Sequence, residues 1–214
     1  MNKDIAAIRK EYQLQSLLET DVAGDPFEQF NRWWHEAVKS ELDEVNAMTL
    51  ATASATGMPS ARIVLLKSFS TGGFVFFTNY NSHKGKEMEE NPYACLVFFW
   101  KELERQVRIT GTIEKVSAAE SDEYFNSRPV GSRIGAWASP QSSVIPSRET
   151  IENNIVKYEG AFAGAEIPRP PHWGGYIVKP MVIEFWQGRP NRLHDRIQYS
   201  KQQDGSWGFE RLAP

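Results

Sequence analysis

The chain has 214 residues, of which 41% are hydrophobic and 24% are charged. A chain of this length is expected to form one domain, with or without additions, and to bury about 70% of its unfolded surface without a metal or disulfide. Its 24 basic and 27 acidic side chains give a net charge of −3, which argues against a dedicated nucleic-acid-binding protein.

The sequence also lacks the signals of export and of membrane insertion. The longest apolar run covers residues 94–100, which is far below the ~20 residues that a membrane helix needs. The first residues, MNKDIAAIRKEYQ, contain neither an apolar stretch nor a small-residue cleavage site. Cys95 is the single cysteine, so it cannot form an intrachain disulfide. We therefore expect a cytoplasmic protein.

The predicted elements begin with an N-terminal arm. Residues 1–20 are expected to form a short helix or a mobile arm, and residues 21–214 a single domain. Asp25 is a favourable N-cap, and Pro26 suits the first helical position. From Phe27 to Leu42, apolar residues recur every three or four positions, which predicts an amphipathic helix.

From Ala47 the apolar period changes to two, which predicts β-strands. Turn signals separate the runs, for example at Gly72-Gly73 and Asn91-Pro92. Because short turns cannot join parallel strands, the sheet is expected to be mostly antiparallel. Many strands with few helices favour a barrel. The predicted strands of this half are 47–54, 61–69, 74–79, 93–100 and 103–116.

Helices interrupt the strands in the second half of the chain. Ser117 and Glu120 have the spacing of a capping box, which predicts a helix through Tyr124. Another helix is expected after Ser147, and the proline-rich residues 167–173 form a connector. Strands resume at 174–178, 181–188, 191–200 and 207–212. This order predicts one closed, mainly β domain with helical insertions.

The motifs of several enzyme classes are absent from the sequence. It contains no glycine-rich dinucleotide or P-loop fingerprint, no H-E-x-x-H zinc motif and no G-x-S-x-G nucleophile motif. The four histidines have no ligand-like spacing, so we predict no metal site. Cys95 lies in a strongly apolar strand, which indicates a core residue rather than a nucleophile.

Two cations flank the apolar part of strand 61–69. Arg62 and Lys67 are five residues apart, so a regular strand would direct them to opposite faces. They would then contact two separate anions. The alternative is that both reach solvent at the ends of the strand.

A second group of cations follows the period of a strand near the C-terminus. Arg192, His194 and Arg196 are spaced by two, so a regular strand would project all three to one face. Like-signed groups repel one another unless an anion lies among them, although solvated edge residues are the alternative. Gln106 and Arg108 share a face of their own strand in the same way.

Further cations and hydroxyl groups occur in loops and at helix starts. Such groups bind phosphate through charge-assisted hydrogen bonds, and on an acidic chain they suit a small phosphorylated ligand better than a nucleic-acid backbone. Trp173 and Trp186 add aromatic surface, although a single tryptophan is more often a core residue. Flavin mononucleotide (FMN) and pyridoxal phosphate each combine a planar ring with a phosphate. The loop groups are 82–84, Arg128, 132–133 and 141–143.

Seven segments together resemble the pyridoxine/pyridoxamine 5′-phosphate oxidase family, in the family's order from about residue 5 to residue 214. The resemblance implies an FMN-binding split barrel, which is an antiparallel Greek-key barrel, and a homodimer with FMN at the subunit interface. It implies oxidation of pyridoxine or pyridoxamine 5′-phosphate to pyridoxal 5′-phosphate, with dioxygen reduced to hydrogen peroxide. The segments are RIVLLK (62–67), LERQVR (103–108), YFNSRP (124–129), QSS (141–143), EFWQG (184–188), RLHDR (192–196) and RLAP (211–214).

The resemblance also implies a set of site residues. The substrate would contact Lys67, Tyr124, Arg128 and Ser132 through its phosphate, Arg192, Leu193 and His194 at its ring, and Arg9, Lys10, Glu11 and Tyr12 in a closing N-terminal segment. FMN would contact Arg62, Ile63, Val64, Leu65, Leu66, Lys67, Phe77, Thr78, His83, Lys84, Gln106, Gln141, Ser142, Trp186 and Arg196. The chain departs from the family at Lys10, where arginine is common, and at His83, where the family often has Ser-Arg-Lys instead of Ser-His-Lys.

The implied chemistry belongs to the flavin, which would take a hydride equivalent at N5, while the protein orients the substrate through its phosphate. Arg192 and His194 would be the catalytic residues. Arg192 would stabilise charge near the alcohol or amine, and His194 would orient that group or accept its proton, with its cationic neighbours favouring the neutral imidazole. Two other classes remain open: a split-barrel flavin reductase with another substrate, and a non-enzymatic protein that binds pyridoxal phosphate or nucleic acid.

Overall fold

The structure is a computed structural model that describes residues 11–214. Its helices and strands, in chain order, are α2 (Pro26–Lys39), β1 (Ala47–Ala53), β2 (Pro59–Leu65), β3 (Ser68–Ser70), β4 (Gly73–Asn79), α3 (His83–Glu90), β5 (Tyr93–Trp100), η1 (Lys101–Leu103), β6 (Arg105–Lys115), α4 (Ala118–Ser127), α5 (Val130–Ala138), α6 (Glu149–Ala161), β7 (Trp173–Gln187), η2 (Pro190–Arg192), β8 (Asp195–Lys201) and β9 (Trp207–Leu212).

The strands belong to one nine-stranded sheet with the order β2-β1-β5-β6-β7-β4-β3, to which β8 is added by pairing with β7 and β9 by pairing with β8. The pairs β3–β4, β4–β7, β7–β8 and β8–β9 are antiparallel, which confirms the expected strand direction. Pro180 lies in β7 between the stretch that pairs with β4 and the stretch that pairs with β8. The missing N–H of proline is tolerated there, so residues 173–187 form one strand where the sequence predicted two.

The chain divides into two compact units. Unit 1 consists of the residues up to Leu50, residues 95–111 and residues 180–214, and unit 2 consists of residues 51–94 and 112–179. The strands β1, β5, β6 and β7 contribute residues to both units. The assignment of residues 21–214 to a single domain stays a prediction.

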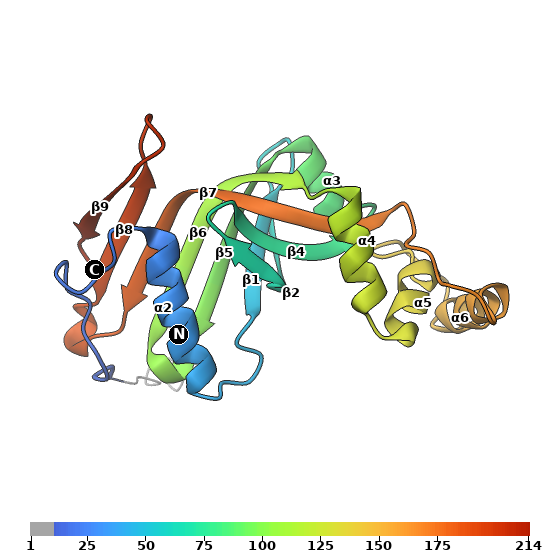
Figure 1. The fold of residues 1–214 in the computed structure, drawn as a ribbon, viewed down its shortest axis with the longest axis horizontal. Helices are drawn as coiled ribbons and strands as arrows, with labels where there is room; N and C mark the ends of the chain where they lie inside the picture. Colours follow the sequence, from blue (N-terminus) through green and yellow to red (C-terminus); the bar gives the residue numbers. More distant parts are fainter. Residues whose placement is uncertain (1–10) are drawn as a thin grey trace, which may run out of the picture. The chain divides into compact units, whose positions relative to one another are not determined.

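Helix α2 belongs to unit 1 (Figure 1), and its Phe27, Phe30 and Trp33 are buried. Asp25 caps the helix by accepting hydrogen bonds from the backbone N–H groups of Phe27 and Glu28, as predicted. Phe30 packs against Phe98 of β5 with ring centroids 5.3 Å apart. The helix ends at Lys39, so Leu42 is not part of it.

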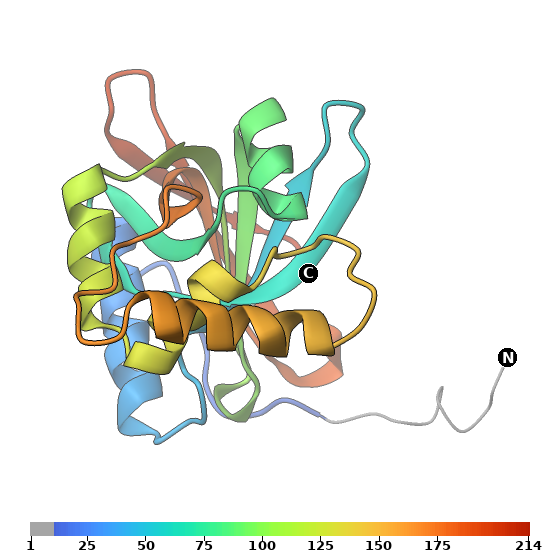
Figure 2. The ribbon, with the colours of Figure 1, turned by 90° about the vertical axis from the view of Figure 1, so that its right-hand side faces the viewer.

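In unit 2, three helices lie between β6 and β7 in the chain. Ser117 accepts a hydrogen bond from the backbone N–H of Glu120 and starts α4, as predicted. Helices α5 and α6 lie side by side (Figure 2), because Trp137 packs against Tyr158 and the Asn154 amide donates to the carbonyl of Ala138. The sequence analysis did not predict α3 or α5.

Two expectations about individual positions were wrong. Cys95 is half-buried rather than in the core, because its neighbours Ala94 and Leu96 take the inward positions of β5. Strand β8 begins only at Asp195, so Arg192, His194 and Arg196 do not share the face of one strand. Pro190 and Asn191 start the short helix η2 instead, in which Arg192 has a positive φ of 62°.

Within residues 11–214, no helix is long and apolar enough to cross a membrane.

Candidate functional site

A cavity of about 660 Å³ opens in unit 2. It brings together twelve residues that were predicted to bind the substrate or the cofactor: Arg62, Ile63, Val64, Leu65, Lys67, Phe77, Thr78, Lys84, Tyr124, Arg128, Ser132 and Gln141. Six residues without a predicted binding role complete the lining: Asn79, Pro129, Gly135, Ala136, Ser139 and Trp173.

Arg62 and Lys67 line this cavity together, although a regular strand would have separated them. The reason is that β2 ends at Leu65. Leu66 is buried, and the chain turns before Lys67 donates its backbone N–H to the carbonyl of Val75 at 2.8 Å. The expectation of opposite faces was therefore wrong, and both cations can act on one bound molecule.

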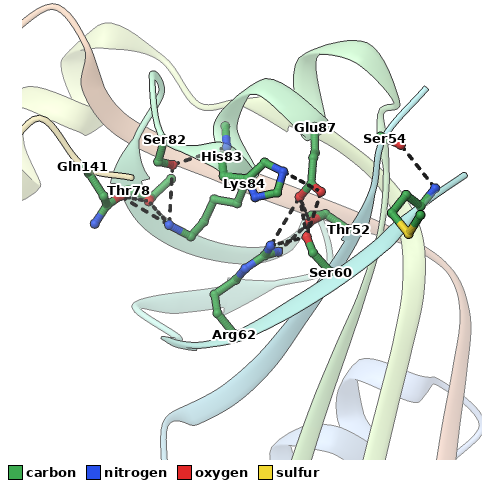
Figure 3. Close-up of polar contacts among 12 residues, drawn as sticks. Thr52, Ser54, Ser60, Arg62, Thr78, Ser82, His83, Lys84, Glu87 and Gln141 are labelled. Carbon is green, nitrogen blue, oxygen red and sulfur yellow. Dashed lines mark hydrogen bonds and ion pairs between the residues drawn. The ribbon is translucent and has the colours of Figure 1, made fainter. Parts of the chain in front are cut away.

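A buried carboxylate organises the first group of cations (Figure 3). Glu87 of α3 is only 4% exposed, and its oxygens accept hydrogen bonds from the hydroxyls of Thr52 and Ser60 at 2.6–2.8 Å. Both hydroxyl oxygens in turn accept from the guanidinium of Arg62, which also contacts Glu87 at 3.2 Å. These bonds hold Arg62 at the cavity, and they lower the pKa of Glu87 against the opposing effect of burial.

Lys84 is the second cation of this group. Its Nζ lies 3.3–3.5 Å from oxygens of Thr78, Ser82 and Gln141 (Figure 3). Burial lowers the pKa of Lys84, and the charge of Arg62 acts in the same direction. An anion beside these two cations would relieve both effects, so the arrangement fits a phosphate group.

Stacked aromatic rings and further cations form another part of the cavity. Phe77 stacks on Tyr124 at 4.0 Å and on Trp173 at 5.5 Å. The guanidinium of Arg128 lies 4.5 Å from the centre of the Trp173 ring, and Lys67 Nζ lies 5.7 Å from that of Tyr124.

The Arg128 guanidinium has an unused donor. Its Nη1 is buried and has no hydrogen-bond partner among residues 11–214, and burial lowers the pKa of Arg128. A buried donor without a partner is unfavourable. An anionic ligand with a planar ring would satisfy this donor and stack against the aromatic side chains.

The residues that were predicted to lie beside the ring of the substrate are in unit 1. Trp186 packs against His194 with ring centroids 4.6 Å apart, and Tyr12 lies 5.8 Å from Trp186 and 6.0 Å from His194. The backbone N–H of Arg189 donates to Nδ1 of His194 at 3.1 Å. In the neutral imidazole the proton is therefore on Nε2. Burial, together with the charge of Arg192, lowers the pKa of His194.

Arg196 is also in unit 1 and is held by a buried carboxylate. Glu184 is 2% exposed and accepts from Arg196 Nε at 2.9 Å and Nη2 at 3.2 Å. Arg108 contacts the same carboxylate. The bonds to Glu184 raise the pKa of Arg196. Gln106 and Arg108 occupy the partly exposed face of β6 while Val107 and Ile109 are buried, as predicted.

Three predicted binding residues of unit 2 do not line the cavity: Leu66, Ser142 and His83. His83 has an exposed side chain whose Nε2 lies 3.3 Å from the Glu87 carboxylate. In unit 1, Leu193 and Glu11 are exposed, while Arg9 and Lys10 are outside the described residues. Their predicted roles stay predictions.

The sequence analysis missed the residues that organise Arg62. Thr52, Ser60 and Glu87 come from β1, β2 and α3, and hydroxyl residues in strands carry no signal of this kind. The one available signal was the spacing of four residues between His83 and Glu87, which brings them together if they lie on a helix.

Comparisons with known proteins define the class. A structure described as a pyridoxamine 5′-phosphate oxidase-related, FMN-binding protein from Nostoc punctiforme superposes with a TM-score of 0.71, at 17% identity, over 90% of this chain and 100% of that one. PhzG from Burkholderia lata, solved in complex with tetrahydrophenazine-1-carboxylic acid, superposes with a TM-score of 0.87, at 29% identity, over 94% of this chain and 99% of that one. The fold is therefore that of the FMN-binding split barrels, as predicted.

The sequence comparisons are more specific. A family model described as pyridoxamine 5′-phosphate oxidase matches residues 34–160, and one described as the pyridoxine 5′-phosphate oxidase C-terminal dimerisation region matches residues 173–214. Curated pyridoxine/pyridoxamine 5′-phosphate oxidases are similar over the full chain: the protein of Trichormus variabilis is 56% identical over 100% of both chains, and that of Ralstonia pickettii is 59% identical over 98% of this chain and 99% of its own. The chain belongs to the pyridoxine/pyridoxamine 5′-phosphate oxidase family.

Proposed function

We propose that the protein is an FMN-dependent oxidase of the cytoplasm that converts pyridoxine 5′-phosphate or pyridoxamine 5′-phosphate to pyridoxal 5′-phosphate. The alcohol substrate and dioxygen give the aldehyde and hydrogen peroxide; the amine substrate also consumes water and releases ammonia. The observation that carries the proposal is the cavity of unit 2, which combines two groups of cations with a wall of stacked aromatic rings. Two phosphorylated planar molecules, the cofactor and the substrate, need these features.

One group of cations would hold the cofactor. Arg62 and Lys84 would bind the FMN phosphate, with Thr78 and Gln141 as neutral partners, and Arg196, Trp186 and Gln106 would contact the flavin. The FMN held by these residues would supply the two-electron acceptor chemistry of the reaction, with dioxygen as the final acceptor.

The other group would bind the substrate. Lys67 and Arg128 provide two charges, and Tyr124 and Ser132 provide two hydroxyls, which together suit a phosphate dianion. The free Nη1 donor of Arg128 would then find an acceptor. Anchoring the remote phosphate would fix the ring at the cofactor, so the binding energy serves orientation.

At the reacting end, His194 would present Nε2–H to the alcohol or amine of the substrate. Its Nδ1 already accepts the backbone N–H of Arg189, so the neutral ring has no free lone pair with which to take a proton. We therefore assign His194 the role of a hydrogen-bond donor that orients the reacting group. Arg192 would stabilise the charge that develops beside it.

The site would be completed in a homodimer. Arg192, His194 and Arg196 all lie within residues 173–214, which match the family's C-terminal dimerisation region. We propose that dimerisation brings these residues of one subunit to the cavity of the other, with FMN at the interface.

The test is an absorbance spectrum of the purified protein, followed by addition of pyridoxine 5′-phosphate under air. We expect flavin bands, and then formation of pyridoxal 5′-phosphate with one hydrogen peroxide per aldehyde. A colourless protein that does not take up FMN would contradict the proposal and favour a non-enzymatic binding protein.

A second candidate function is oxidation of a reduced aromatic carboxylic acid. It is favoured by the 29% identity to PhzG, whose structure contains such a molecule. A yellow protein that turns over this class but not pyridoxine 5′-phosphate would support the second candidate. Loss of turnover when the phosphate of the substrate is removed would support the first.

A further inference from the structure

The residue that precedes β6 ties the N-terminal segment to the end of β7. Glu104 is 3% exposed, and its Oε2 accepts the backbone N–H groups of Gln13 at 2.8 Å and Leu14 at 3.1 Å. Its main-chain carbonyl accepts the N–H of Gly188 at 2.7 Å and the amide of Gln187 at 3.2 Å. Glu104 has a positive φ of 54°, a conformation that costs free energy for a residue other than glycine.

The next residue, Arg105, contacts the same two segments of the chain. Arg105 is buried and donates through Nε to the side chain of Gln187 at 2.9 Å, while its Nη2 contacts the side-chain oxygen of Gln15. Glu104 and Arg105 thus contact residues 13–15 on one side and residues 187–188 on the other. We refer to this pair as the Glu104–Arg105 clamp.

The clamp holds the N-terminal segment where the ring of Tyr12 packs directly against Gly188. A Cβ atom at Gly188 would lie 2.7 Å from Cγ of Tyr12, so the ring occupies space that only glycine leaves open at that position. The same ring lies 5.8 Å from that of Trp186 and 6.0 Å from that of His194. Tyr12 therefore covers one side of the His194 imidazole.

We propose that Glu104 is a positioning residue for His194, which acts by fixing residues 13–14 and so seating Tyr12 beside the imidazole. The inference rests on the proposed function, in which His194 orients the reacting group. Glu104 acts through the backbone N–H groups of Gln13 and Leu14, from which its side chain accepts hydrogen bonds. Its contribution is to keep His194 covered and in one orientation.

The other groups around His194 are not part of the clamp. Arg192, on η2, lowers the pKa of His194, and Asp195, at the start of β8, raises it. Asp195 also pairs with Arg189 and Arg211. Since burial is the largest cause of the lowered pKa of His194, releasing Tyr12 should raise that pKa while these charges stay in place.

The test compares Glu104→Ala, which removes the acceptor, with Glu104→Gln, whose amide oxygen can still accept from both N–H groups. Glu19→Ala is the matched control, because it removes the ion pair that the same N-terminal segment makes with Arg211 and leaves the clamp intact. Hydrogen exchange of residues 11–18 reports docking of the segment. The NMR titration of the His194 ring, assigned by its loss in His194→Gln, reports cover of the imidazole without requiring turnover.

For Glu104→Ala we expect exchange at residues 13–14 to be about tenfold faster or more, since two hydrogen bonds to a charged acceptor are lost. We also expect the His194 titration to move to higher pH. Glu104→Gln should lie close to wild type, and Glu19→Ala should change neither readout. Unchanged exchange, or faster exchange with an unmoved His194 titration, would overturn the inference.

Gly188→Ala provides a second route if Glu104→Ala does not fold. It should displace Tyr12 and move the His194 titration upward; an unmoved titration would overturn the inference. The proposed function is tested separately by turnover of wild type. If wild type does not oxidise pyridoxine 5′-phosphate, the function fails, whereas the exchange and titration results still decide whether Glu104 positions His194.

Discussion

Several cations of unit 1 are held differently from those that line the cavity of unit 2. In unit 1, Arg196 and Arg108 share the buried carboxylate of Glu184, and Arg211 pairs with Glu19 and Asp195. In unit 2, Lys67, Lys84 and Arg128 line the cavity without an ion pair to any of residues 11–214 and instead contact hydroxyls, amides and aromatic rings.

This difference separates two tasks. A cation whose charge is already compensated by a carboxylate keeps its geometry but attracts an anion less, whereas an uncompensated cation in a cavity attracts an anion strongly. The cavity of unit 2 therefore suits an anion such as the phosphate of the proposed ligands, whereas the carboxylates of unit 1 hold their cations in fixed positions. Among the cations that line the cavity, Arg62 is the exception, because Glu87 holds it.

Mixed dimers give the sharpest test of how the two tasks combine. One subunit carries Arg128→Ala and the other Arg192→Ala, with different affinity tags for purification. If each site uses the cavity of one subunit and Arg192 of the other, one site of the mixed dimer contains both defects and the other contains none. At a pyridoxine 5′-phosphate concentration well below the KM of wild type, we expect each parent homodimer to keep about a tenth or less of wild-type turnover, and the mixed dimer to regain about half of it. A mixed dimer no more active than its parents would contradict completion across the interface.

Within unit 2, Arg128→Ala removes a cation without a carboxylate partner. We expect KM for pyridoxine 5′-phosphate to rise by a factor of about 10 to 100, with a smaller effect on kcat, because one charged hydrogen bond of about 1.5–3 kcal/mol is lost. Steady-state kinetics measure this effect. Arg148→Ala is the control, because Arg148 is almost fully exposed and lies just before α6. An unchanged KM would remove Arg128 from the substrate site.

Within unit 1, Arg196→Ala should affect the cofactor rather than the substrate. We expect FMN affinity to fall by about tenfold through loss of a charge-assisted contact. His194→Gln should depress kcat/KM while flavin content stays near that of wild type. The ratio of flavin to protein absorbance measures occupancy. Arg108→Ala is a matched control, since it contacts the same carboxylate of Glu184. The opposite pattern of occupancy would show that the predicted roles of Arg196 and His194 are exchanged.

The sequence predicted the fold better than it predicted the positions of the side chains. The period of two and the short turns were sufficient for an antiparallel sheet, and Asp25 and Ser117 marked two helix starts correctly. Helix α5 was missed because its sequence, VGSRIGAWA, contains two glycines and has no capping side chain. Local pattern alone carries little signal for such a helix.

The candidate site shows the same limit. The resemblance to a family selected twelve residues that line one cavity, but the geometric arguments for Arg62 with Lys67 and for Arg192 with Arg196 both assumed strands that continue. Both strands are interrupted, at Leu65 and before Asp195. Pro190 and Asn191 were the available warning, since both residue types favour turns. The hydrogen bonds among Thr52, Ser60 and Glu87 depend on tertiary contacts between separate elements, which a single sequence does not reveal.

The smallest expected effect concerns His83, which lies beside the carboxylate that holds Arg62. His83 contacts Glu87, the same carboxylate that holds Arg62. We expect His83→Arg to bind FMN about two- to fivefold more tightly at pH 8, as an exposed charge contributes less than about 1 kcal/mol. Arginine keeps its charge across this range, whereas histidine is the side chain that changes charge near neutral pH. The advantage should therefore be smaller at pH 6 than at pH 8.

The measurement is the ratio of FMN dissociation constants of wild type and His83→Arg at the two pH values. The phosphate of FMN also gains charge above its second pKa of about 6, but this change is common to both proteins and cancels in the ratio. His35→Arg adds the same charge on α2 of unit 1 and should leave the ratio at one. A ratio for His83→Arg that does not change with pH would show that His83 is not a charged ligand of the phosphate. Weaker binding by His83→Arg would mean that the new arginine competes with Arg62 for Glu87, so that the carboxylate, and not residue 83, controls the charge at this part of the cavity.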